Sequence, residues 1–295
     1  MRDVLLTALA PIIWGTTYFV TTQFLPPNRP LFASAIRAAP IGLLMLVWSR
    51  ELPKGMWFWR AFVLGTLNIG LFFALLFTAA YRLPGGVLAT LMAIQPFLVA
   101  LLAWVILAEH PALRTFIAAF FGLLGVGLIV FGPRAHFDMV GVIAGTAATL
   151  AMATGTVLTK RWGRSAPLLV LTSWQLVAGG LMLLPVTFAI EGIPPVLTPK
   201  NLLGFAWLGI VGTGIAYALW FRGIRNLKAS TVAFLGLLSP ISAMLLDFLL
   251  LKKTLTTMQI VGAALVFGGI FLSQIEKRRD EGATRYQNMP GSESE

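Results

Sequence analysis

The fold of this chain is decided by two stretches of sequence, LPGGVLATLMAIQPFLVALLAWVILA at residues 83–108 and LKASTVAFLGLLSPISAMLLDFLLLK at residues 227–252. The first contains no Asp, Glu, Lys or Arg and is longer than the roughly 20 apolar residues that a helix needs to cross a bilayer. A shift of 144 residues lays one stretch on the other without gaps, and it aligns Leu83 with Leu227 and Pro96 with Pro240. We therefore expect a membrane protein with an internal repeat.

The same register covers a large part of both halves of the chain. It places residues 60–130 on residues 204–274, and it aligns Gly65 with Gly209, Gly70 with Gly214 and Gly125 with Gly269. The preceding helices follow at slightly smaller shifts, and a shift of 138 pairs Arg37 with Gln175. Single apolar matches arise easily by chance, but prolines and glycines that match in one gapless register indicate a duplicated unit.

The composition excludes an ordinary soluble protein. Hydrophobic residues make up 58% of the 295 residues and charged residues only 11%, whereas soluble domains carry about 25% charged residues; the mean hydropathy is +0.85. A net charge of +11 would suggest a nucleic-acid partner in a soluble protein, but here the basic residues lie in short gaps between apolar runs, so we expect no nucleic acid. The chain has no cysteine, and His110 and His136 fall at the ends of apolar runs. We therefore expect neither a metal centre nor a cofactor.

Ten runs are long enough to cross a bilayer. Eight of them lack charged residues, namely 4–28, 61–81, 83–108, 115–133, 139–159, 165–190, 201–221 and 254–275. The other two each contain one charge, Arg37 in residues 31–49 and Asp247 in residues 229–251. We predict an all-α integral membrane protein with ten transmembrane helices and no extramembrane domain.

The distribution of positive charge predicts the orientation. With ten spans, both termini lie on the same side, which then holds 15 of the 22 Lys and Arg residues, against 6 on the opposite side and Arg37 within a span. The excess places both termini in the cytoplasm. Residues from Glu276 onward indicate a polar, disordered cytoplasmic tail. We therefore expect a first repeat at residues 1–135, a second at residues 136–275 and a tail at residues 276–295.

The odd number of helices in each half determines how the repeats are related. Five helices per half mean that the second half enters the membrane from the opposite side, which makes an inverted-topology repeat. In transporters such repeats hold a binding site near the midplane, and one half rocks against the other. Pro96 and Pro240 each remove a backbone donor in mid-span, so each should kink its helix and free carbonyls for protein, water or ligand. A purely structural role for both prolines is the alternative.

Several motifs resemble those of EamA-type transporters of the drug/metabolite transporter superfamily. They are IWGTTY at residues 13–18, IRA at 36–38, LPGGV at 83–87, IQP at 94–96, LAE at 107–109 and FGLLGVG at 121–127. The resemblance extends over residues 3–275, and the opening residues 10–18 and 25–30 are similar to the PecM-type branch. Where Glu109 closes the fourth helix, the second half has Lys252 and Lys253, although the family usually keeps an acid there as well. A role that requires both acids is therefore in doubt.

The resemblance implies a carrier in the bacterial cytoplasmic membrane. Members of this family export small metabolites, amino-acid derivatives or drug-like compounds, and their ligands generally occupy a central cavity between the two repeats. The partners that follow are a small-molecule substrate and the lipid bilayer.

Aromatic and hydroxyl side chains share a face on two of the predicted helices. The first stripe consists of Trp14, Tyr18, Thr21 and Thr22, and the second of Thr213, Tyr217 and Trp220. Such a stripe suits a cavity that stacks an organic substrate and bonds its polar groups. A helix-packing face, or an interfacial position for Tyr18, is the alternative.

Amides and hydroxyls inside the apolar spans are further candidates for substrate binding. They are Asn68, Gln95, Thr154 and Gln175. An interhelical hydrogen bond, worth about 0.6 kcal/mol on average, is the alternative for each of them. Gln95 is favoured for a substrate contact because it stands beside Pro96.

Arg37, Asp247 and Glu109 are the candidates for gating or coupling. A cation within a span costs about 2.5–3.5 kcal/mol, so Arg37 should face a partner or a cavity. It lies about 10 Å from the outer end of its helix, at a level similar to that of Asp247, which suggests an outer charge pair that gates the cavity or carries a proton. Alternatively, Arg37 snorkels to the interface or bonds helix carbonyls, and Asp247 pairs with Lys252 or Lys253. Glu109, at a membrane edge, is a further group that can titrate.

The sequence favours a secondary carrier over other kinds of membrane protein. It contains no Walker A motif, so an ion gradient, with protons among the candidates, or the substrate's own gradient would drive transport. We expect no enzyme and no catalytic residues, because Asp247 is the only carboxylate within a span. An importer of the same fold, a non-transporting sensor or assembly protein, and a homodimeric state remain open.

Overall fold

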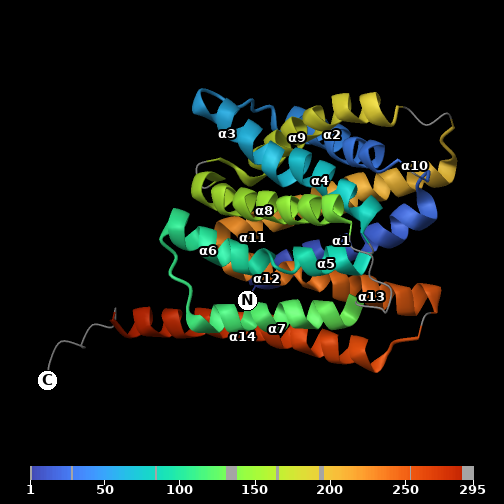
Figure 1. Cartoon of the computed structure of the whole chain (residues 1–295). Coiled ribbons are helices and arrows are strands. Elements are labelled where there is room, and N and C mark those ends of the chain that lie inside the picture. Colours follow the sequence, from blue (N-terminus) through green and yellow to red (C-terminus); the bar gives the residue numbers. More distant parts are fainter. Residues whose placement is uncertain are drawn as a thin grey trace, which may run out of the picture.

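The computed structural model is a bundle of long helices that run alongside one another (Figure 1). The structure describes residues 2–27, 29–83, 85–130, 138–163, 166–192, 196–252 and 254–287. Within these ranges the regular structure is helical and includes no strand. Eight helical segments are long and apolar enough to cross a membrane, and two shorter apolar helices, Leu113–Ile129 and Thr257–Ser273, accompany them. The prediction of an all-helical, multi-pass membrane protein is confirmed.

The helices up to residue 130 form the first half of the chain. They are α1 (Arg2–Phe24), α2 (Pro30–Ser49), α3 (Met56–Gly65), η1 (Thr66–Gly70), α4 (Leu71–Arg82), α5 (Gly85–Met92), α6 (Gln95–Leu107) and α7 (Leu113–Val130). The helices of the second half are α8 (Met139–Trp162), α9 (Leu168–Ile190), α10 (Pro199–Ala206), η3 (Trp207–Ile215), α11 (Ala216–Asn226), α12 (Ala229–Gly236), α13 (Leu238–Leu251) and α14 (Thr257–Gln287).

One span in each half contains a π-helical segment. The elements α3, η1 and α4 form one continuous span, as do α10, η3 and α11, and both η1 and η3 are π-helical. π-Helical turns are rare overall, but those that occur are often found at functional sites. They take carbonyl groups out of the regular α-helical hydrogen-bond ladder. In η3 the carbonyls of Leu208 and Gly212 accept hydrogen bonds from side chains.

A second span in each half is interrupted close to a proline. Ala93 and Ile94 separate α5 from α6, and Leu237 separates α12 from α13. Pro96 and Pro240 stand directly after these breaks, where each lacks the amide hydrogen that would bond the carbonyl four residues before it. The two breaks and the two prolines coincide when the chain is shifted by 144 residues.

The ends of these spans match in the same register. α6 and α13 are followed by Ala108 and Lys252, which have left-handed φ angles of 55° and 52°. α4 and α11 are followed by Leu83 and Leu227, whose extended backbones each return an amide hydrogen bond of 2.8 Å to the residue four positions earlier. Corresponding helices of the two halves therefore stop at corresponding residues and in the same manner.

Two pairs of helices, α7 with α14 and α2 with α9, pack closely through glycines. A Cβ atom added to Gly125 would lie 2.5 Å from the carbonyl oxygen of Gly262, and one added to Gly269 would lie 2.7 Å from that of Ala118. Because residues 118 and 262, like 125 and 269, are 144 positions apart, each contact has a counterpart in which the two halves exchange places. The α2–α9 pair repeats this reciprocity, with Gly42 against Val177 and Gly180 against Ala39.

The last helix is longer than the sequence predicts. α14 continues to Gln287, whereas a disordered tail was expected from Glu276. Residues 276–287 contain no proline and are rich in Glu, Lys and Arg, which have high helix propensity and so allow the helix to continue beyond its apolar part. Residues 288–295 lie outside the described part of the chain.

Candidate functional site

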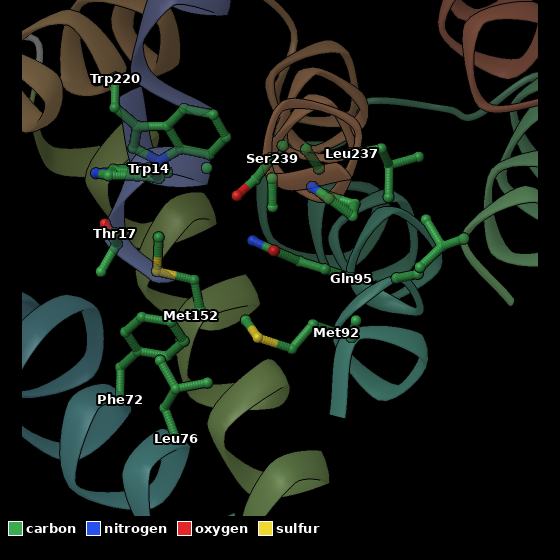
Figure 2. A pocket seen from close by; sticks show the side chains of 18 of the residues that line it. Trp14, Thr17, Phe72, Leu76, Met92, Gln95, Met152, Trp220, Leu237 and Ser239 are labelled. Atoms are coloured by element: carbon green, nitrogen blue, oxygen red, sulfur yellow. The ribbon is translucent and has the colours of Figure 1, made fainter. Parts of the chain in front are cut away.

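A cavity of about 300 Å³ lies between the two halves of the chain (Figure 2). α1, α2, α4, α5, α6 and α7 contribute lining residues from the first half, and α8, α11, α12 and α13 contribute them from the second. Its aromatic and polar lining includes Trp14, Thr17, Arg37, Gln95, Tyr217 and Trp220. Pro96 and Pro240 line the cavity as well, so both helix breaks lie at this site.

Three aromatic side chains from α1 and α11 form one wall of the cavity. The ring of Trp14 lies 5.1 Å from the rings of both Tyr217 and Trp220, at a tilt of 56° to each. Trp14 is held in place by its indole nitrogen, which donates a 3.0 Å hydrogen bond to the carbonyl of Gly212 in η3. Tyr217 and Trp220 are almost fully buried. The structure thus brings together members of the two aromatic stripes that the sequence placed on separate helices.

Arg37 reaches the cavity from α2 and is only 5% exposed. Its Nε donates a 2.9 Å hydrogen bond to the hydroxyl of Thr213, and its Nη2 donates one of 3.0 Å to the carbonyl of Gly212. The guanidinium carbon also lies 5.1 Å from the centre of the Phe73 ring, a cation–π contact. These contacts fit the alternative in which Arg37 bonds a helix carbonyl. The side chain of Asp247 lies outside the described part of the structure.

Asn68 and Gln175 form a hydrogen bond with each other and are not among the described residues of the cavity lining. The Asn68 amide donates to Gln175 Oε1 at 2.7 Å and to the hydroxyl of Thr159 at 3.0 Å, and all three residues are buried. In the repeat register Asn68 corresponds to Gly212 and Gln175 to Arg37. The amide pair, which joins the two halves, is therefore the counterpart of the Arg37–Gly212 contact.

Three polar atoms of the cavity lining are buried and have no hydrogen-bond partner among the described residues. They are Nε1 of Trp220, Nε2 of Gln95 and Oγ1 of Thr17. Figure 2 shows the Gln95 amide pointing across the cavity toward the side where Thr17 and Trp14 lie. Buried polar groups in folded proteins are nearly always hydrogen-bonded, so unsatisfied ones in a cavity indicate a place for a ligand or water.

The remaining predicted substrate residues lie elsewhere. Thr213 stands behind Arg37, because its hydroxyl accepts from the guanidinium and donates to the carbonyl of Leu208 at 2.8 Å. The hydroxyl of Thr154 donates to the carbonyl of Leu150 in its own helix, and Thr154 does not line the described cavity. The side chain of Tyr18 lies outside the described part of the structure.

Polar contacts join the two halves at the end of the bundle where α1 begins. Glu109, just beyond α6, lies 3.5 Å from the ammonium of Lys160 in α8 and accepts a 3.4 Å hydrogen bond from the amide of Ala229, the first residue of α12. A carboxylate at this position is favoured by the positive end of the helix dipole. Lys160 also donates to the carbonyl of Leu227. Glu109 is therefore not part of the cavity but belongs to a cluster that ties α6, α8 and α12 together.

A second ion pair stands at the same end. Asp3 of α1 accepts from Arg222 of α11 at 2.8 Å and from the amide of Asn226 at 3.4 Å. A third ion pair stands at the opposite end, where Arg82 and Asp138 approach to 3.4 Å with side chains 47% and 40% exposed. At each end of the bundle, an Asp at the start of one helix thus pairs with an Arg near the end of a helix in the other half.

The opposite end has a contact that the sequence did not indicate. Both carboxylate oxygens of Glu191, at the end of α9, accept from the first amides of α2, at 2.9 Å from Leu31 and 2.8 Å from Phe32. These amides have no partner within their own helix, so the carboxylate caps α2 from the other half of the chain. Charge at a loop position is common, and only the fold shows that Glu191 meets a helix start.

Several apolar lining residues were also missed. Phe72 and Phe73 of α4, Met92 of α5 and Met152 of α8 line the cavity. Each stands among many similar residues in an apolar span, so the sequence contains no signal that separates it from a lipid-facing or packing residue.

Comparison with known proteins matches the sequence of this chain to a family of transporters. The model of the EamA-like transporter family matches the chain twice, at residues 1–131 and 139–274. The chain is 45% identical to the protein PecM of Dickeya dadantii over 267 residues, which cover 90% of both chains. It is 22% identical to a probable amino-acid metabolite efflux pump of Salmonella typhimurium over 92% of this chain and 94% of that protein.

The fold is also present among solved structures. A crystal structure that is 19% identical in sequence superposes with a TM-score of 0.81 and covers 95% of this chain and 99% of its own. At this identity the similarity concerns the fold alone.

Proposed function

This chain belongs to the EamA-like transporter family, and from that premise we propose that it is a secondary-active carrier that exports small amphipathic metabolites, amino-acid derivatives or drug-like compounds. The observation that carries this proposal is the cavity between the two halves, whose walls combine aromatic rings with hydrogen-bond donors that have no partner among the described residues. An amphipathic organic molecule satisfies both kinds of surface, because its ring packs on the aromatic wall while its polar groups accept hydrogen bonds.

The ten-helix, inverted-repeat architecture is part of the proposal. In this proposal the eight long and two shorter apolar helices are the ten spans, five in each half. The double match of the family model, with its gap at residues 132–138, supports repeats at residues 1–135 and 136–275. The matched helix breaks, helix ends and reciprocal glycine contacts support a two-fold relation between the repeats.

We place the carrier in the bacterial cytoplasmic membrane, with both termini in the cytoplasm. The charge distribution is the argument for this orientation, and the bacterial relatives are consistent with the location. The end of the bundle that carries the Glu109–Lys160 and Asp3–Arg222 pairs is then cytoplasmic, and the Arg82–Asp138 pair faces outward.

The difference between the two ends indicates which way the cavity faces. The aromatic wall of Trp14, Tyr217 and Trp220 lies toward the cytoplasmic end, and Arg222 of α11 follows directly after this wall. Glu109 anchors the start of α12 at that end, whereas the matched positions of the second half, Lys252 and Lys253, provide no carboxylate for the corresponding start of α5. We infer that the cavity faces the outer side here, with the cytoplasmic contacts closed, and that transport alternates this state with an inward-facing one.

We propose that an ion gradient drives transport. Arg37, Asp247 and Glu109 remain the candidates for gating or coupling, with a proton among the candidate ions. Glu109 is suited to gating, since it bonds groups of the other half directly. A homodimer remains open.

The test is transport by purified protein in liposomes. A panel of labelled amino acids, metabolites and dyes is offered with and without a pH gradient, and a saturable flux of at least one compound is expected. Dependence on the pH gradient would direct attention to Asp247 and Glu109. An absence of flux across the panel, with protein whose helical content and monodispersity are intact, would contradict the carrier and favour a non-transporting sensor or assembly role.

A further inference from the structure

Among the described residues, Arg37 is a buried cation without a buried anion beside it. None of the described residues that line the cavity is an Asp or a Glu, and the acceptors of Arg37 are a hydroxyl and a backbone carbonyl, which are both neutral. Its third nitrogen, Nη1, makes no hydrogen bond with the described residues. A buried charge that lacks a counter-charge is costly, so this site stabilises any anion that enters the cavity.

The other unsatisfied groups of the cavity are also suited to donate. The indole nitrogen of Trp220 can only donate, and Trp220 is 1% exposed, so no solvent outside the cavity satisfies it. The unsatisfied atom of Gln95 is its amide nitrogen, a donor, and the hydroxyl of Thr17 can donate as well. A ligand that fits these groups is rich in acceptor oxygens.

The shape of the cavity adds a second requirement. Trp14, Tyr217 and Trp220 present tilted rings at 5.1 Å spacings, and Met92 and Met152 extend toward the cavity between α5 and α8 (Figure 2). Flat aromatic walls favour a planar ligand, and the flexible thioethers adapt to its edges. The volume of about 300 Å³ suits a molecule with one or two rings.

We propose that the cavity selects planar aromatic anions over aromatic cations of the same shape, with a carboxylate or similar group at Arg37 and further acceptors at Trp220 and Gln95. The inference rests on the proposed function and adds the charge and shape of its substrates. The carbonyls freed by Pro96 and Pro240 work against it, because they would attract a cation. A comparison of anion binding with cation binding therefore shows whether Arg37 or these carbonyls determine the selectivity.

Three compounds with one planar skeleton separate charge from shape. Cinnamate, cinnamamide and cinnamylamine carry a carboxylate, a neutral amide and an ammonium group on the same styryl frame. We would measure their binding to the purified full-length chain in detergent by titration calorimetry. Cinnamate should bind at least roughly tenfold more tightly than cinnamylamine, since hydrogen bonds to charged groups are the stronger ones. Cinnamamide should lie between the two.

Variants then assign the preference to named groups. Arg37→Gln should remove the advantage of cinnamate over cinnamamide, and Arg37→Lys should retain part of it, because the charge remains while the planar fork is lost. Trp220→Phe keeps an aromatic wall without the donor, and it should weaken cinnamate binding several-fold. Arg82→Gln is the matched control, since it removes the same charge from the half-exposed Arg82–Asp138 pair outside the cavity. It should leave all three affinities unchanged.

The outcomes separate this inference from the proposed function. Tighter binding of cinnamylamine, equal binding of the three compounds or binding of none would overturn the anion site. A preference for cinnamate that persists in both Arg37→Gln and Trp220→Phe would remove these residues as its cause and overturn the assignment as well. Because calorimetry needs no flux, a carboxylate preference without transport in liposomes would contradict the carrier and leave the site intact. Transport without a charge preference would contradict the anion site and leave the carrier function intact.

Discussion

At the residue scale, the polar contacts of η3 show how one backbone irregularity organises the site. The π-helical turn leaves the carbonyl of Gly212 outside the regular helical ladder, and this oxygen accepts from both Trp14 and Arg37. One carbonyl therefore fixes an aromatic ring from α1 and a cation from α2 at the same level of the bundle. A change at either side chain should be felt at the other through this shared acceptor.

The first prediction concerns the suspected pair of Arg37 and Asp247. The contacts of Arg37 are with Thr213, Gly212 and Phe73, so Arg37→Gln and Asp247→Asn should act independently. Transport by the double variant should be no better than that of the worse single variant. If the two charges form a pair, removing both should instead restore part of the activity, because no unpaired charge is left behind. Initial rates in liposomes for the four proteins measure the difference.

Much of the site could be predicted from single residues, for physical reasons that differ between them. Polar or amphipathic groups are costly inside an apolar span and therefore stand out in the sequence. Four residues found in this way line the cavity, namely Trp14, Gln95, Arg37 and Tyr217. The same signal also selected Asn68 and Thr154, which satisfy their groups elsewhere in the protein. The free-energy cost of a polar group inside the membrane thus identifies residues that need a partner. It does not reveal whether that partner is a ligand or another helix.

At the element scale, the helix breaks beside Pro96 and Pro240 could be predicted from the matched prolines, whereas the π-helical segments could not. A missing amide hydrogen is visible in the sequence. The π-helical segments Thr66–Gly70 and Trp207–Ile215 pack against α9 and α2, and no local pattern in the sequence marks either segment.

The prolines give a prediction about the rate of transport. Pro96→Ala and Pro240→Ala each restore an amide donor next to the cavity and should straighten the span. Thermal stability should stay equal or rise, while the transport rate should fall in both variants, because the broken helices lose freedom to move. Unchanged rates in both variants, with the protein still folded, would show that the breaks serve packing only.

Adjacent glycines in α14 provide a matched pair for the α7–α14 contact. A methyl group at Gly269 would press on the carbonyl of Ala118 at 2.7 Å, whereas one at Gly268 meets nothing within 4 Å. Gly269→Ala should therefore cost about 1–3 kcal/mol of stability through overpacking. Gly268→Ala should be neutral or slightly stabilising, because alanine favours helix. Thermal unfolding in detergent compares the two, and equal effects would argue against close packing at this crossing.

At the scale of the whole molecule, the arrangement into two related halves follows from the sequence register more directly than any single contact does. A shift of 144 residues aligns the helix breaks, the left-handed helix ends at Ala108 and Lys252 and the glycines of the α7–α14 crossing. The register did not predict that the final helix would extend to Gln287. That segment has no counterpart in the first half and no apolar face, so neither repetition nor hydropathy constrains it.

The cluster around Glu109 gives a prediction for the balance between inward-facing and outward-facing states. Glu109→Gln weakens the contacts to Lys160 and to the start of α12, so the cytoplasmic end should open more often. A loss of about 1 kcal/mol corresponds to a roughly fivefold shift in the ratio of the two states. Arg82→Gln removes only a half-exposed pair at the opposite end and should leave the ratio unchanged, because such pairs contribute little. Equal shifts in the same direction would contradict the assignment of the two ends.

We propose that the cavity between the halves opens to one side of the membrane at a time, and that it faces outward in this structure. The chain contains no cysteine, so Ser239→Cys places a single thiol at the cavity wall, where Ser239 is a lining residue (Figure 2). Labelling with a membrane-impermeant maleimide in right-side-out and inside-out vesicles then reports access from each side, since the reagent needs a thiol in water. Thr154→Cys, whose parent residue lies outside the cavity lining, is the control. We predict strong labelling of Ser239→Cys from the outer side and weak labelling from the cytoplasmic side that increases when Glu109→Gln is added. Labelling from the cytoplasmic side alone, or from neither side, would contradict the claim.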